Sequence, residues 1–162
     1  MSARRIDVVA QYDEHYFLLR RRVPDAVEPR RIGNPIRWRD AAAERLCMLT
    51  REMHNRTIIE ASFASAGVSP RPAMETNSVL PLVLAVLAGD VCSVLPGALV
   101  DIALQYPELE ALPLVEPDVV TPIGLLIQRG GLFSITQHAA LRMASEPDWL
   151  AHAARHSGLL DG

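Results

Sequence analysis

Residues 46–95 read LCMLTREMHNRTIIEASFASAGVSPRPAMETNSVLPLVLAVLAGDVCSVL, and short apolar segments alternate in this run with segments of helical periodicity. The apolar segments 46–49 and 91–95 predict buried strands, and 72–76 predicts a third strand after a proline-rich turn. Strands that alternate with helices are typical of an α/β fold.

Two helices are predicted between these strands. The first follows Asn55, which is expected to cap it, and its apolar residues recur on one face until Gly67 stops it. The second covers 79–88 and ends at Gly89. A third short helix is predicted over 98–105.

Further strands are predicted on both sides of this central unit. The segment 6–12 is rich in β-branched residues and predicts a buried strand, and 16–19 predicts a short extended piece. Strands are also predicted over 109–115 and 123–128, and Ser134 is expected to cap a last helix. A buried strand that begins at the sixth residue indicates that part of its unit is missing.

The charge of the chain gives no general attraction to nucleic acid. All sixteen basic residues are Arg, nineteen residues are acidic, and the net charge is -3. Aromatic residues make up only 5%, which argues against a surface that stacks nucleobases. Direct binding to DNA by this chain is therefore not expected.

The sequence predicts a soluble cytoplasmic protein. Its two cysteines, Cys47 and Cys92, lie in apolar runs and do not form a CxxC motif. No signal peptide is recognisable, and the most apolar segment, 79–87, is too short to cross a membrane.

No catalytic or metal site is predicted. His152 and His156 have the spacing of two ligands on one helix face, but no neighbouring group completes a set, so a solvated tail is the better interpretation. Cys47 and His54 could form a nucleophile and base, yet the cysteine lies in a buried strand without a third orienting group. We expect no enzyme activity, no metal and no cofactor.

Short polar residues follow two of the predicted strands. Thr50, Arg51 and Asn55 come between the first strand and its helix, and Thr76, Asn77 and Ser78 come between the next pair. Ligands of open α/β sheets bind beyond the carboxyl ends of strands, where helix N-termini attract small anions. The six residues therefore predict a pocket for a carboxylate or other oxyanion. The alternative is that Asn55 and Ser78 only cap helices.

Three runs in this order resemble a known family. They are residues 56–70 (RTIIEASFASAGVSP), 74–78 (METNS) and 86–96 (VLAGDVCSVLP). Together they resemble the effector-binding domain of LysR-type transcriptional regulators, and the segments 6–9 and 112–125 resemble other strands of that domain.

The resemblance implies a periplasmic-binding-protein type II-like fold with two α/β lobes and an effector in the cleft between them. It implies a complete second lobe at 39–106 and an incomplete first lobe at 1–38 and 107–148, followed by a tail at 149–162. By similarity, the effector-binding residues are those that follow the two strands: Thr50, Arg51, Asn55, Thr76, Asn77 and Ser78.

The chain departs from the family in what comes before residue 5. The winged helix-turn-helix of the family and the first elements of its first lobe are not in this sequence, so DNA binding would need a domain absent from this chain. The first strand would then leave Ile6, Val8 and Val9 partly uncovered. We expect the chain to pair with another copy through this edge or to be marginally stable.

The sequence thus predicts the small-molecule sensing domain of a LysR-type regulator that acts as a homo-oligomer, without a membrane partner. A solute-binding protein that serves transport is the alternative, and a small enzyme ranks third.

Overall fold

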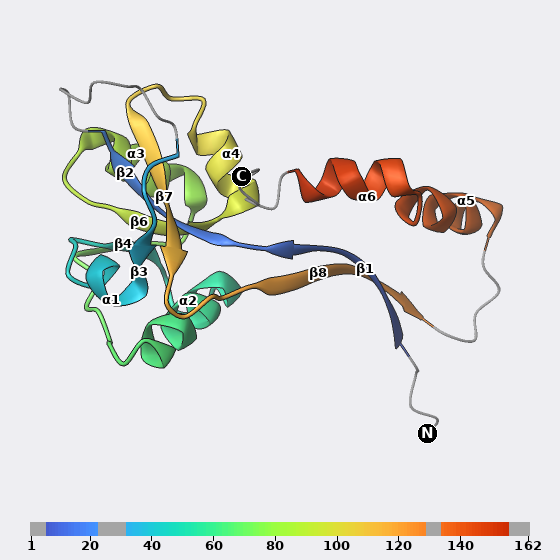
Figure 1. The fold of residues 1–162 in the computed structure, drawn as a ribbon, viewed down its shortest axis with the longest axis horizontal. Helices are drawn as coiled ribbons and strands as arrows, with labels where there is room; N and C mark the ends of the chain where they lie inside the picture. Colours follow the sequence, from blue (N-terminus) through green and yellow to red (C-terminus); the bar gives the residue numbers. More distant parts are fainter. Residues whose placement is uncertain (1–5, 23–31, 129–133, 156–162) are drawn as a thin grey trace.

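The computed structural model describes residues 6–22, 32–128 and 134–155, which form a compact body and a long arm (Figure 1). In chain order the strands are β1 (Ile6–Glu14), β2 (Tyr16–Arg21), β3 (Ile36–Arg37), β4 (Cys47–Leu49), β5 (Met74–Thr76), β6 (Ser93–Pro96), β7 (Leu109–Val115) and β8 (Thr121–Gln128). The helices are α1 (Trp38–Ala41), α2 (His54–Ser65), α3 (Val79–Ala88), α4 (Gly97–Ala103), α5 (Ile135–Ala144) and α6 (Pro147–Ala154).

The body is built on a mixed sheet. Four strands pair in the order β3-β7-β2-β6, and β4 pairs in parallel with β5. A parallel bridge between Leu46 and Cys92 joins these two groups next to β6. The strands therefore follow one another as β3-β7-β2-β6-β4-β5, and β2 runs antiparallel to both of its neighbours.

Strand β2 is the centre of the body because both of its faces are buried. Phe17 and Leu19 pack into one core cluster with α3 and α4, while Tyr16 and Leu18 pack into a second cluster on the opposite face with α1 and α2. Successive side chains of a strand point to opposite faces, so a strand with no polar alternation needs a layer on each side. The result is a sheet between two helical layers.

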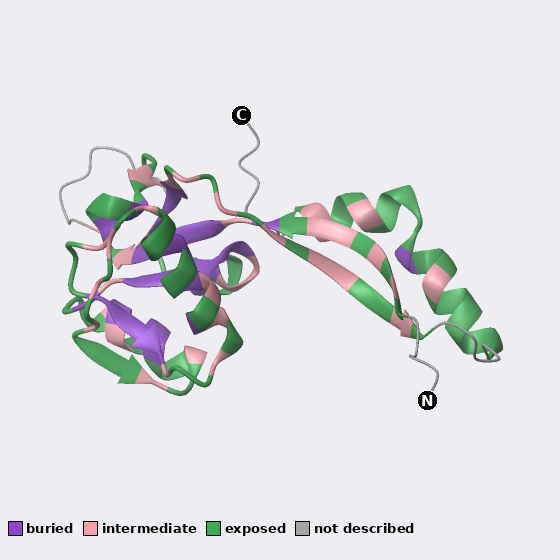
Figure 2. Ribbon diagram, turned by 90° about the horizontal axis from the view of Figure 1, so that it is seen from below, coloured by how far each residue is buried: buried purple, intermediate pink, exposed green. Residues whose placement is uncertain are grey.

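The arm consists of β1 and β8, which pair only with each other among the described residues, and of α5 and α6 (Figure 2). Helix α6 packs against β1. The Gln11 amide donates to the carbonyl of Ala144 at 3.1 Å, and the Trp149 indole donates to the Gln11 amide oxygen at 2.7 Å. The arm thus has one face towards the helices and one open face.

For the first 21 residues, one sequence expectation is wrong and one is confirmed. The segment 6–12 does not form a buried strand: Ile6 is 60% and Val8 is 65% exposed, because β1 has one partner strand and one helix-covered face among the described residues. The segment 16–19 is extended, as expected, and forms the buried part of the central strand β2.

The grouping of strands also differs from the expected one. Strands β2 and β7 were assigned by the resemblance to the flanking unit, yet both hydrogen-bond within the sheet that contains β6. Continuous apolar runs, four residues in β2 and five in β7, belong in a doubly covered sheet, which explains their position. The body therefore extends beyond residues 39–106.

The structure confirms some of the residues that were predicted to start or stop helices and contradicts one of them. Gly67 follows α2 and Gly89 ends α3, both with positive φ, and Ser134 forms a capping box with Gln137. Asn55 does not cap α2, because the helix begins one residue earlier at His54, behind Met53. Ser78 occupies the N-cap position of α3, but its side chain makes no capping hydrogen bond. No described helix has the length and apolar character needed to cross a bilayer.

Truncation of a buried ring tests the second core cluster. Phe63 is fully buried and packs edge-on against Trp38, with ring centroids 5.1 Å apart. We expect Phe63→Ala to lower the free energy of unfolding by about 3–5 kcal/mol, measured by urea denaturation. The control Ile135→Ala, at a side chain that is 90% exposed, should leave it nearly unchanged. Equal effects of the two substitutions would contradict this assignment of the core.

Candidate functional site

Two corners with predicted site residues lie side by side at the carboxyl edge of the sheet. We call residues 50–53 the β4 corner and residues 76–78 the β5 corner. Leu49 and Thr76 are register partners in the parallel pair, and the backbone amide of Thr50 donates to the carbonyl of Thr76 at 2.9 Å. Helices α2 and α3 begin directly after these corners, so both helix N-termini lie at the same edge.

The six predicted residues differ in their position at this edge. Thr50 and Thr76 are half-buried and adjacent, whereas Arg51, Asn77 and Ser78 are exposed. Asn55 is half-buried within the first turn of α2, outside the β4 corner. The pairing brings Thr50 and Thr76 together and sets Arg51 and Ser78 on the solvent side of their corners.

Hydroxyl groups of the two corners serve different roles. The Thr76 hydroxyl accepts a weak hydrogen bond from the Ser78 amide at 3.4 Å, which closes the β5 corner. The Thr50 hydroxyl oxygen is shielded from solvent and has no partner of standard hydrogen-bond geometry among the described residues. The pKa of the Glu52 carboxyl is lowered mainly by its own backbone amide and, to a smaller extent, by the Thr50 hydroxyl.

Arg56 holds the β4 corner to its surroundings, and the sequence prediction did not include it. Its side chain is only 2% exposed. The guanidinium donates to the carbonyl of Leu49 at 2.6 Å, to the Glu75 carboxylate at 2.9 Å and to the Glu60 carboxylate at 2.8 Å. One cation thereby connects the end of β4, strand β5 and helix α2.

Part of this arrangement could have been inferred from spacing. Glu60 follows Arg56 by four residues, the distance at which oppositely charged side chains meet on a helix. The contacts with Leu49 and Glu75 depend on the pairing of β4 with β5, which spacing alone does not give.

A third corner at the same edge is occupied by a carboxylate of the chain itself. Helix α4 begins at Gly97 after β6, and Glu14 at the end of β1 is 5% exposed. Its carboxylate accepts a hydrogen bond from the Ala98 amide at 3.0 Å. Burial raises the pKa of Glu14, against the smaller opposing effect of the amides of Ala98 and Gly97 and of the Tyr12 hydroxyl.

Two more contacts connect the arm to the body beside Glu14. The hydroxyls of Tyr16 and Thr121 lie 2.8 Å apart and share a hydrogen bond, and the Gly97 amide donates to the carbonyl of His15 at 2.9 Å. The junction between arm and body thus adjoins the edge that carries the β4 and β5 corners.

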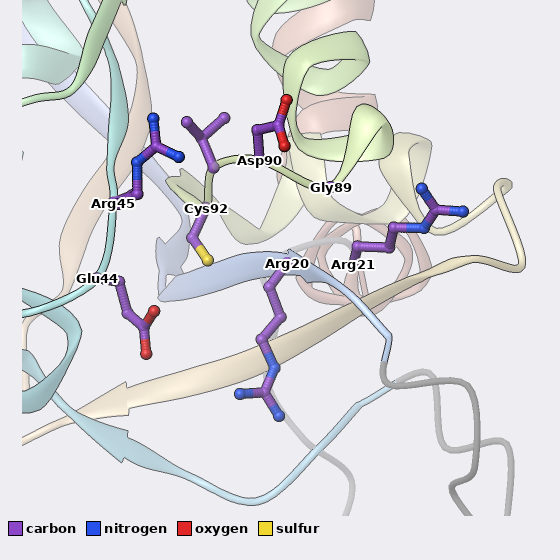
Figure 3. Close-up of a pocket in the computed structure, with 8 residues that line it drawn as sticks. Arg20, Arg21, Glu44, Arg45, Gly89, Asp90 and Cys92 are labelled. Atoms are coloured by element: carbon purple, nitrogen blue, oxygen red, sulfur yellow. The ribbon is translucent and has the colours of Figure 1, made fainter.

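A cavity of about 200 Å³ lies at the opposite edge of the sheet. It is found where β4 and β6 begin, and Figure 3 shows that the guanidinium groups of Arg20, Arg21 and Arg45 extend in different directions. Arg20 is already paired with Glu110 at 2.7 Å. The three cations do not converge on one point, so the cavity is not an evident anion site.

Cys47 and the histidines of the tail at 149–162 are the residues that the sequence analysis considered for catalysis or metal binding. Cys47 is buried in β4 and its pKa is raised by burial, which favours the unreactive thiol. His156 lies outside the described residues. Within 6–22, 32–128 and 134–155, no group of three or more His, Cys, Asp or Glu side chains could hold a metal ion.

An α/β body with paired polar corners at the carboxyl edge of its strands is the architecture of a small-molecule binding lobe. Residues 12–146 match the model of the LysR substrate binding domain, so the chain belongs to that family. Its fold is the periplasmic-binding-protein type II-like fold expected from the sequence, and the alternative of a transport protein is not favoured.

Solved structures agree with this fold. The effector binding domain of QuiR in complex with shikimate has a TM-score of 0.63 and 14% identity, and the match covers 94% of this chain and 65% of that domain's chain. The CcmR regulatory domain of Synechocystis PCC6803 in complex with 2-PG has a TM-score of 0.69 and 17% identity. This match covers 94% of the present chain and 69% of the CcmR chain.

A third structure is the C-terminal domain of a probable LysR family transcriptional regulator from Rhodococcus sp. RHA1, with a TM-score of 0.66 and 17% identity. This match covers 90% of the present chain and 70% of the Rhodococcus chain. The chain spans 46% of the regulator CbnR. No protein of curated function matches the sequence.

Removal of the Arg56 guanidinium tests its role at the β4 corner. We expect Arg56→Leu to lower the free energy of unfolding by about 1–3 kcal/mol, because the buried carbonyl of Leu49 loses its donor. The control Arg37→Leu removes an exposed pair with Asp40 and should have a smaller effect in the same urea titration. A larger loss from the control would contradict this role.

The raised pKa of Glu14 predicts a pH effect on stability. A carboxyl with a raised folded-state pKa binds more protons in the folded chain, so its contribution weakens as the pH rises from 4.5 through the folded pKa. Glu14→Gln removes this dependence while its amide oxygen can still accept from Ala98. The stability of the variant relative to the natural chain should therefore increase between pH 4.5 and pH 7, measured by urea denaturation at each pH. A constant or decreasing difference would contradict the raised pKa.

Proposed function

We propose that the chain senses a small molecule on behalf of a LysR-type transcriptional regulator. Membership of the LysR substrate binding domain family supports this proposal most strongly. The small molecules in the QuiR and CcmR structures, shikimate and 2-PG, support a ligand of similar size. DNA recognition in this proposal depends on a separate domain.

The proposed ligand is a carboxylate or another small anion bound at the β4 and β5 corners. Arg51 supplies an exposed positive charge, and the N-termini of α2 and α3 supply partial positive charge. The hydroxyls come from Thr50, Thr76 and Ser78. Asn77 adds an exposed amide beside them. Asn55, within α2, is proposed to orient the first turn of that helix.

We propose that ligand binding is transmitted through the arm. The junction at Glu14 and Tyr16 adjoins the ligand edge, so a molecule that prefers one angle between arm and body shifts the population towards that angle. The body is then one lobe of the sensor, and the arm is a part of the other.

The remaining parts of the proposal concern the setting of the chain. A regulator meets its DNA in the cytoplasm, and we place the protein there. We also propose that it works as a homo-oligomer, without catalysis, cofactor or metal. LysR substrate binding domains belong to transcription regulators, which are generally not enzymes.

A thermal-shift screen against small carboxylates and phosphate tests the ligand proposal. We expect at least one acid to raise the melting temperature. Arg51→Ala and Ser78→Ala should each weaken the apparent affinity for that acid about tenfold, which is about 1.4 kcal/mol, and should therefore reduce the shift. The controls Arg142→Ala and Ser69→Ala change the same residue types at exposed positions elsewhere and should retain the full shift. Equal losses in sites and controls would contradict the proposed position of the ligand.

A further inference from the structure

The two strands of the arm reach the body at one place, and each makes a side-chain hydrogen bond to it there. Strand β1 ends at Glu14 and β8 begins at Thr121, and these two residues are register partners. The Glu14 carboxylate accepts from the Ala98 amide at 3.0 Å, and the Thr121 hydroxyl shares a hydrogen bond of 2.8 Å with Tyr16. Figure 1 shows the two strands leaving the body side by side, so both are fixed to it at the same level.

Helix α4 has no cap of its own. Its N-cap residue is Pro96, which makes no side-chain hydrogen bond, and no acidic residue lies in its first turn. Glu14 supplies the missing acceptor from outside the helix, and the Gly97 amide donates to the carbonyl of His15 at 2.9 Å. The first two amides of α4 thus hold the two residues that lead from the arm into the body.

The start of α4 lies beside the proposed ligand. The parallel bridge between Leu46 and Cys92 places β6 next to β4. Four residues further along each strand, Thr50 lies level with Pro96, and α4 begins directly after Pro96. The helix start that holds the arm is therefore the neighbour of the β4 corner.

We propose that Glu14 and Tyr16 form a two-point latch that sets the angle between arm and body and, through this angle, the ligand affinity of the β4 and β5 corners. The two points are the contacts of Glu14 with Ala98 and of Tyr16 with Thr121. One hydrogen bond leaves a ribbon free to turn about it, whereas two contacts on neighbouring strands also fix its twist. The part that concerns affinity rests on the proposed function, and the latch itself does not.

The burial of both residues gives the junction two discrete states. Glu14 and Tyr16 are almost fully buried. A buried carboxylate without a hydrogen-bond donor is strongly unfavourable, so Glu14 either keeps its contact with Ala98 or turns into water. Because Glu14 is the last residue of β1, its release requires the arm to turn relative to the body. A molecule bound at the neighbouring corners then favours the latched state if it needs the start of α4 in place.

Distances between two spin labels test the latch without any ligand. One label is attached at Ala64→Cys on the exposed side of α2 and the other at Val8→Cys in β1. The half-buried Cys92 is replaced by Ser, and Cys47 is fully buried. Labelled chain is diluted with unlabelled chain, so that only distances within one copy are recorded. The natural junction should give one narrow distribution of distances.

Two pairs of matched variants decide the outcome. Glu14→Leu should broaden the distribution, whereas Glu14→Gln keeps an oxygen that can accept from Ala98 and should preserve it. Tyr16→Phe should also broaden it, whereas Tyr106→Phe removes the same hydroxyl at an exposed position and should not. Circular dichroism verifies the fold, and Tyr16→Phe keeps the test decisive if Glu14→Leu does not fold. An unchanged distribution in Tyr16→Phe, or equal broadening in a variant and its matched control, would overturn the latch.

The thermal-shift screen tests the effect on affinity with the same variants. For an acid that binds the natural chain, Glu14→Leu and Tyr16→Phe should each weaken the apparent affinity about tenfold, because only the latched fraction binds. Glu14→Gln should restore most of it. Broadened distances with unchanged affinity would overturn the link between latch and ligand. If no acid binds the natural chain, the proposed function fails, and the latch stands or falls on the distances alone.

Discussion

The buried guanidinium of Arg56 is the contact on which the candidate site depends. It is the group that joins the last carbonyl of β4 to Glu75 of β5 and to Glu60 of α2. A buried cation is tolerated only when it is fully paired, and here the pairing also fixes where β4 ends. Both carboxylates remain partly exposed, so the guanidinium is desolvated more than its partners. The position of Thr50 relative to Thr76 follows from this arrangement.

The sequence predicted those parts of the fold that depend on local pattern. The alternation of strands and helices between β4 and β6, the glycines that end α2 and α3, and the family were all recognisable from periodicity and motifs. The adjacency of Thr50 and Thr76 also follows from that pattern, because parallel neighbouring strands end at one edge. The ligand itself has not been tested, and the six-residue site stays a prediction.

The errors have a common physical cause, which is that burial is set by partners distant in sequence. Residues 6–12 and 16–19 both predict extended segments, yet β2 lies between β6 and β7, while β1 pairs only with β8 among the described residues. The roles of Glu14 and Arg56 were missed for the same reason. Their partners, Ala98 and Glu75, are 84 and 19 residues away in the chain. The error at Asn55 has a different cause, because the first residue of a helix is hard to locate from sequence: Asn55 was expected to cap α2, but it lies inside the first turn.

The connection between β1 and β2 has a mechanical consequence. Only His15 separates the two strands, so the arm continues directly into the central strand of the body. A rotation of the arm therefore acts directly on the strand that is hydrogen-bonded to β6 on one side and to β7 on the other. The direction of the arm and the position of the central strand are thus mechanically coupled through a single residue.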